Sequence, residues 1–223
     1  MGEYYNWVNV DKKEYICPAD FNSGSKFREI MHKDSAPLHA LHTLLSGKWK
    51  GDRVLWLGDE CLVSNQFSNN IIQILYDQSV QFGYLGEAFN MIYESYKNIS
   101  GLFKEAEEEV REEIGYYLAE LKNYGKLEHC NEYGVNLEHP FEGLFIEQGK
   151  RYTYIINHTK KIYYLLDETQ VFDQSHMRNE YLDPLLVLLG YGRVSNHGEW
   201  LGDIIGVSNQ RPEGYVLLKE LEI

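Results

Sequence analysis

The sequence predicts an α+β protein in which one hairpin, helix and strand unit occurs twice, the two copies sharing a mostly antiparallel sheet. Three observations predict this. A segment of eleven residues recurs near the C-terminus, similar aromatic hairpin patterns precede both copies, and a long stretch of helical periodicity separates them. We therefore expect a first unit (1–66), a helical insert with its connector (67–149) and a second unit (150–223), all within one compact domain.

The recurring segment begins with Trp-Leu-Gly-Asp. It starts at Trp56 in the first unit and at Trp200 in the second, and eight of its eleven positions are identical. Upstream of each copy, residues 4–16 and 152–164 hold two aromatic runs joined by an Asn-led turn with Lys-Lys, which is typical of a hairpin. Features that recur in the same order indicate a repeated unit. Trp56 and Trp200 should then be equivalent core residues.

Each unit continues with a helix that begins at a Pro-Leu pair. Ser35 precedes the first helix, which we expect to end at Ser46, because serine is a favoured N-cap and proline is tolerated in the first turn. The second helix is expected within residues 179–190. A buried strand, 53–57, follows the first helix and ends at a Gly-Asp turn.

The insert has helical periodicity without a counterpart in the second unit. Its apolar spacing and its Asn and Gly boundaries predict three helices, at 71–82, 87–97 and 100–124. The outer face of the third helix is rich in glutamate. The C-terminal tail, 215–223, fits either a strand or a short helix, because both periodicities are present.

Composition restricts the classes of function. The formal net charge of −13 favours basic partners and disfavours binding to nucleic acid. We see no long apolar run and no charged leader with an apolar core, so we expect neither a membrane span nor a secretion signal, and hence a cytoplasmic protein. The three cysteines, Cys17, Cys61 and Cys130, are far apart, which fits reduced thiols. No nucleotide or esterase motif is present, and we expect no cofactor.

Several N-terminal stretches resemble a family of uncharacterised bacterial proteins. They have the patterns GxYxxWVN, KEYI and WKGDxVxxxGDE, and they lie at 2–9, 13–16 and 49–60. The resemblance extends along the whole chain. It implies no activity, cofactor or site residue for this protein.

Two sets of residues could support catalysis or metal binding. Asp59 and Asp203 are matched by the repeat, and paired carboxylates could form an acid–base or metal site. The alternative is that both are turn residues that bind their own backbone. His39 and His42 lie one helical turn apart and could share a metal ion, or they could simply be partly exposed helix residues.

The remaining candidates concern thiols and binding surfaces. Cys61 and Cys130 lie in acidic surroundings that do not favour a reactive thiolate. Aromatic side chains on the expected strands could anchor a partner or pack across the sheet. The glutamates of the third insert helix could bind a basic partner or form a solvated face. The candidate binding residues are Tyr5, Trp7, Tyr154, Glu108, Glu109 and Glu112.

Two functional hypotheses follow. The first is a non-catalytic, acidic cytoplasmic binding protein that docks on a basic protein, for example to neutralise a toxin or an effector, as an immunity protein does. The second is a small metal-dependent hydrolase that uses Asp59, Asp203 and histidines. A stoichiometric metal in the purified protein would distinguish them.

Overall fold

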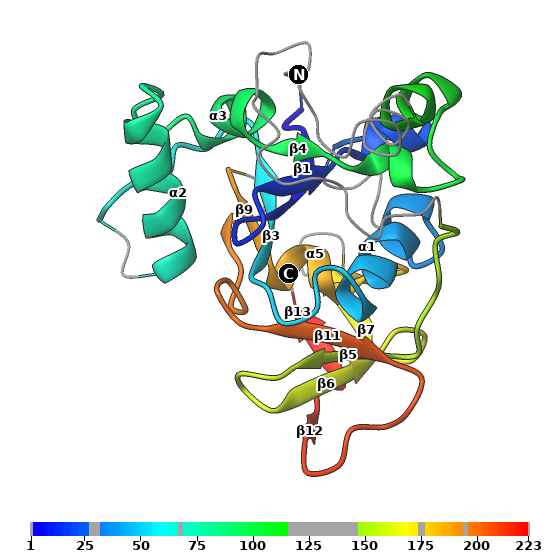
Figure 1. The fold of residues 1–223 in the computed structure, drawn as a ribbon. Helices are drawn as coiled ribbons and strands as arrows, with labels where there is room; N and C mark the ends of the chain where they lie inside the picture. The colour runs from blue at the N-terminus through cyan, green and yellow to red at the C-terminus, as the bar shows by residue number, and fades with distance from the viewer. Residues whose placement is uncertain are drawn as a thin grey trace.

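The computed structural model describes residues 2–26, 32–66, 69–115, 147–173, 177–193 and 196–222. It confirms the α+β class. Three mixed sheets pack with helices, and the largest sheet lies above the four-stranded one in Figure 1, with α2 and α3 at the left and α1 at the right.

The largest sheet has six strands and is built mainly from the N-terminal part of the chain. Its order is β10 (Asn196–His197), β9 (Gly190–Gly192), β3 (Val54–Gly58), β1 (Tyr5–Asn9), β2 (Glu14–Ile16) and β4 (Lys97–Asn98). β1 pairs antiparallel with both β2 and β3, and Trp7 lies opposite Trp56. β3 pairs parallel with β9, so a strand from the C-terminal third completes this sheet.

Two smaller sheets complete the fold. One has the order β11 (Ile205–Ser208), β5 (Tyr154–Asn157), β6 (Ile162–Leu165) and β12 (Val216–Leu217). The other has the order β13 (Glu220–Glu222), β7 (Gln170–Asp173) and β8 (Arg178–Glu180). The tail thus forms strands, which settles the alternative that its sequence left open.

The prediction of one shared sheet holds only in part, because β9 and β10 of the second unit join the sheet of β1, β2 and β3 but the second hairpin does not. The hairpin β1–β2 and the hairpin β5–β6 lie in separate sheets. In one sheet β3 pairs with the free edge of β1, and in the other β11 pairs with the free edge of β5. The two sheets meet through side chains of a common core, which contains Trp7 and Trp56 from one sheet and Ile155 and Tyr164 from the other.

Helices cover both faces of the six-stranded sheet. The helical elements are η1 (Pro18–Phe21), α1 (Ala36–Ser46), α2 (Asn70–Gln81), α3 (Ala88–Ser95), η2 (Ser100–Leu102) and α5 (Pro184–Leu188). Alternate residues of a strand face opposite sides of a sheet. Accordingly Leu55 and Leu57 of β3 pack in the cluster that contains residues of α2 and α3, whereas Trp56 packs in the cluster that contains residues of α1 and α5.

The helical insert is confirmed for its first two helices. The Asn69 side chain accepts a hydrogen bond from the backbone of Ile71 and caps α2, which decides between the two possible caps, Asn69 and Asn70, that the sequence offers. Ser100 begins η2 instead of a long helix, because its hydroxyl binds the backbone N–H of Cys17. Helical structure resumes at 108–115, and the rest of the predicted helix lies outside the described residues.

The two hairpin regions have the same strand order and the same kind of turn before the third strand, but the residues that correspond in the structure are not those that the sequence repeat aligns. The strand order β2, β1, β3 matches β6, β5, β11. The turn that enters the third strand is 49–52 in one region and 200–203 in the other, with Gly51 at φ 85° and Gly202 at φ 86°. Trp56 lies within β3, so its predicted equivalence with Trp200 is wrong, although both are buried.

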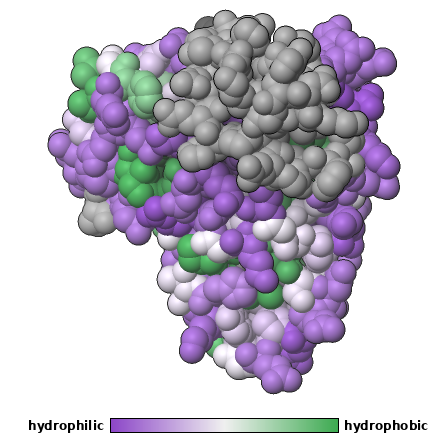
Figure 2. Space-filling model, in the orientation of Figure 1, coloured by the Kyte–Doolittle hydropathy of each residue, from purple (hydrophilic) through white to green (hydrophobic). Residues whose placement is uncertain are grey.

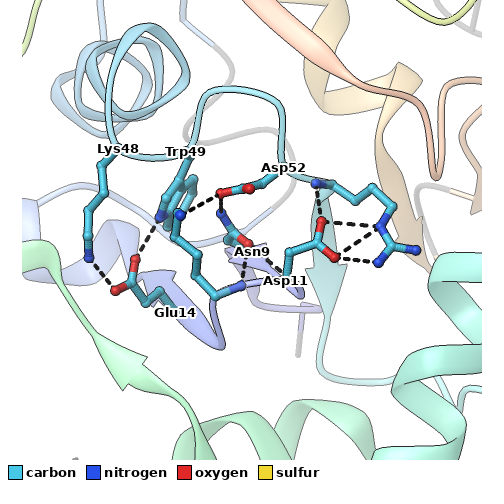
Figure 3. Close-up of polar contacts among 8 residues, drawn as sticks. Asn9, Asp11, Glu14, Lys48, Trp49 and Asp52 are labelled. Atoms are coloured by element: carbon cyan, nitrogen blue, oxygen red, sulfur yellow. Dashed lines mark hydrogen bonds and ion pairs between the residues drawn. The ribbon is translucent and has the colours of Figure 1, made fainter. Parts of the chain in front are cut away.

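One polar network recurs in these two regions. Asn9 Nδ2 donates to Asp52 at 2.9 Å, and Asn9 Oδ1 accepts from the Lys12 backbone N–H at 2.9 Å, as Figure 3 shows. In the second region, Asn157 Nδ2 donates to Asp203 at 2.8 Å, and Asn157 Oδ1 accepts from the backbone of Lys160 at 2.9 Å. Each network ties a hairpin turn to the turn before the third strand.

Candidate functional site

A cleft of about 530 Å³ opens beside the start of β1. This volume lies within the usual range for ligand pockets, about 300–1,000 Å³. The cleft is walled by β1, the chain around η1, the end of β3 and α3 with its preceding turn. Its lining residues are Tyr4, Tyr5, Asn6, Cys17, Ala19, Ser25, Asp59, Tyr84, Phe89, Asn90, Tyr93 and Glu94.

The base of the cleft holds neutral polar groups. Asn6 is 1 % exposed, and its side-chain amide interacts with the Tyr93 hydroxyl. The Cys17 Sγ lies 3.8 Å from the Tyr93 hydroxyl. Burial raises the pKa of Cys17 to about 11, and burial together with the neighbouring thiol raises the pKa of Tyr93. Neither group is ionised near neutral pH, so this thiol is no nucleophile.

The walls are aromatic and the rim is acidic. Phe89 and Tyr93 lie on one side of α3, with ring centroids 5.2 Å apart. Asp59 accepts a hydrogen bond from the backbone N–H of Tyr4 at 2.9 Å, and a hydrogen bond to exposed Glu94 raises the pKa of Tyr84. Among the described residues that line the cleft, none is Lys, Arg or His. The cleft therefore favours a cationic or neutral ligand over an anion.

An exposed apolar patch adjoins the cleft. It consists of Leu62, Phe82 and Leu85, which are 62 %, 48 % and 76 % exposed. The Val63 backbone N–H donates to the carbonyl of Gly86, which brings the loop of Leu62 beside the turn that carries Leu85. Figure 2 shows hydrophobic residues gathered at the upper left, over the end of α2 and the turn to α3. Tyr84 of the cleft lies within that same turn.

The two candidate carboxylates do not meet. Asp59 follows β3, whereas Asp203 precedes Ile204, which pairs with Arg53 at the opposite end of β3. With about 3.3 Å per strand residue, the two carboxylates lie roughly 20 Å apart. Both make turn contacts, Asp59 with the Tyr4 backbone and Asp203 with Asn157. Each carboxylate thus has a structural partner, but in a distant segment and not in its own backbone as the alternative interpretation expects.

His39 and His42 are more buried than their helix position indicates. His42 is fully buried, and its Nε2 lies 3.6 Å from the Asp183 carboxylate. His39 Nε2 is buried without a hydrogen-bond partner in the described part of the chain, and burial, then His42, lowers the pKa of His39. No cluster of three His, Cys, Asp or Glu suited to a metal ion occurs among the described residues. Asp183 instead caps α5 and binds the Tyr164 hydroxyl.

The candidate binding residues separate into two groups. Tyr5 and Trp7 are fully buried, and Tyr154 is half-buried against Tyr163, because their strands face the core. Tyr5 and Trp7 pack the core and are not available as contact residues, apart from the edge of Tyr5 that reaches the cleft. The three candidate glutamates, Glu108, Glu109 and Glu112, are exposed on the 108–115 helix.

Sequence reasoning missed most of the cleft. Phe89 and Tyr93 lie on α3 and Tyr84 in the turn before it, and no fixed spacing joins these residues to Asn6 and Cys17. Of the remaining candidates, Cys61 is half-buried and Cys130 lies outside the described residues.

Comparisons with family models, with curated proteins and with solved structures give no match. None of the helices in the described ranges has the length and apolar character needed to cross a membrane. Function is therefore argued from the geometry of the cleft and of the exposed patch.

Proposed function

We propose that this protein is a non-catalytic protein-binding module that docks on a basic partner protein through the exposed patch and the acidic cleft beside it. The observation that carries the proposal is the exposed patch itself. Contiguous exposed apolar side chains with a polar surround are typical of protein interaction sites. The surround here is acidic, with Asp59 and Glu94 at the cleft rim, and the whole chain carries a net charge of −13.

Leu85 is the most informative residue of the exposed patch. Its φ is 48°, in the left-handed region, where a residue with a Cβ costs about 1–2 kcal/mol. Its side chain is mainly in solvent and contributes little packing to offset that cost. Backbone strain that stability does not explain is characteristic of functional positions.

A positive φ alone does not mark a site, and Met177 provides the comparison. It has a φ of 52° and is 76 % exposed, but it lies in the turn before β8 and does not belong to the exposed patch. Leu85 differs by its exposed apolar neighbours and by the adjoining cleft.

The glutamates of the 108–115 helix extend the acidic surface. The Glu107 backbone N–H donates to the Asp20 carbonyl at 2.7 Å, which fixes the start of this helix beside η1. Ala19 of the same η1 lines the cleft. A basic partner seated on the cleft would therefore be attracted by Glu108, Glu109 and Glu112, mainly through a faster association that added salt slows.

The test compares matched variants in a pull-down from native cytosol. Leu85→Gly should leave the free energy of unfolding unchanged or raise it by up to about 1 kcal/mol, because strain is relieved, yet recover less partner. Met177→Gly is the control and should recover as much partner as the wild type. Reversing Glu108, Glu109 and Glu112 to Lys should also weaken recovery without unfolding the protein.

Equal recovery by Leu85→Gly and the wild type would contradict the proposal. A wild-type protein that recovers no partner but turns over a substrate would favour the metal-dependent hydrolase instead.

A further inference from the structure

We infer that the cleft is the receptor for an arginine side chain of the partner protein. The inference rests on the proposed function and specifies which group of the partner is recognised. It is carried by three features that converge in one cavity: polar groups at the base, aromatic rings on the walls, and two carboxylates at the rim.

The base of the cleft is polar and includes a hydrogen-bond acceptor. Asn6 is buried, and its side-chain amide interacts with the Tyr93 hydroxyl. The Cys17 Sγ lies 3.8 Å from the same hydroxyl. A phenol oxygen has two lone pairs, so it can accept a hydrogen bond from a ligand as well as from Asn6. The base can therefore accept a hydrogen bond from a donor-rich group.

The walls select a flat, cationic group. Tyr84, Phe89 and Tyr93 present aromatic rings, and a guanidinium stacks on such rings with a cation–π attraction. Asp59 and Glu94 add negative charge at the rim, and no cationic side chain among the described lining residues competes for it. A guanidinium has five N–H donors in one plane, which suits acceptors at both the base and the rim.

The volume of the cleft also suits a peptide-borne side chain. A cavity of about 530 Å³ is larger than one side chain needs, which leaves room for the peptide groups that flank the arginine. The exposed patch begins at the adjoining turn and would cover the apolar neighbours of that arginine.

The experiment titrates the full-length protein with N-acetyl-arginine amide and follows its backbone amide signals by NMR. N-acetyl-citrulline amide, which has the same shape without the charge, is the matched control ligand. We expect the arginine probe to bind at least about tenfold more tightly, the usual effect of a hydrogen-bonded charge, with shifts at Ser25 and Asn90 of the cleft lining.

Matched protein variants locate the site. Asp59→Asn with Glu94→Gln removes both rim charges but keeps an acceptor for the Tyr4 backbone, and should weaken the arginine probe at least about tenfold. Glu213→Gln removes an exposed carboxylate outside the cleft lining and should change nothing. Circular dichroism confirms that each variant is folded.

Equal binding of arginine and citrulline probes, equal binding of N-acetyl-lysine amide, or unchanged binding by the rim variant would overturn the inference. The two proposals can fail separately. If partner capture depends on Leu85 but no arginine probe enters the cleft, only the arginine inference fails. If the probe binds while Leu85→Gly captures the partner normally, the docking proposal fails instead.

Discussion

Replacing Trp49 or Trp56 by Phe should have very different effects on stability, although both indole rings are fully buried. The packing lost is similar for the two changes, about 1–3 kcal/mol. Trp49 Nε1 donates to the Glu14 carboxylate at 2.9 Å, whereas Trp56 Nε1 is buried without a partner among the described residues. Figure 3 shows Glu14 held between the Trp49 ring and Lys48.

The hydrogen bonds decide the difference. Trp49→Phe should lose a charge-assisted bond worth about 1.5–3 kcal/mol in addition to the packing. Trp56→Phe should instead relieve an unsatisfied N–H whose burial costs about 1–3 kcal/mol, which offsets the packing loss. In urea unfolding followed by circular dichroism, the free energy of unfolding of Trp56→Phe should therefore be at least about 2 kcal/mol higher than that of Trp49→Phe. If Trp56→Phe is the less stable of the two, this reasoning about the core is refuted.

Two further predictions concern the turns and the histidines. Gly51→Ala should lower the free energy of unfolding by about 1 kcal/mol, from its positive φ alone. Gly202→Ala should lower it further, because its Cβ would lie 2.7 Å from Asn70 and 3.2 Å from the α2 cap residue Asn69. Equal urea midpoints would argue against this difference. The pKa of His39 is lowered in the folded state, so the unfolded chain binds the proton first and stability should fall as pH drops below about 6.5. His39→Gln should reduce the loss of stability measured between about pH 7.5 and 5.5, while His32→Gln, at an exposed histidine, serves as the control.

The fold features that sequence could predict depend on local signals. The α2 boundary follows from the Asn69 cap and from the apolar period of the helix, and both act within a few residues. Short strands such as β4 and β12 have only two residues, too few for a period, and they form because a distant strand is available for pairing. This explains why the helical insert was largely predicted and the sheet order was not.

The repeat shows how identity can mislead about structure. Trp56 and Trp200 begin the most similar segments, but one belongs to a strand and the other to the turn before a strand. The structural match at Trp49 has fewer identical neighbours, and it is revealed by the strand order, the φ of Gly51 and Gly202, and the paired contacts of Asn9 and Asn157. The cleft was unpredictable for a related reason, because its lining is assembled from segments that are distant in sequence.

The parallel pairing of β3 with β9 has a consequence for biosynthesis. Residues 54–58 are made long before the strand that covers their outer edge, Gly190–Gly192. Until then the nascent chain presents an apolar strand with unpaired backbone groups, a surface that invites pairing with other chains. We therefore expect the largest sheet to be completed only once Gly190–Gly192 has left the ribosome, so that newly made chains depend until then on chaperones that shield β3.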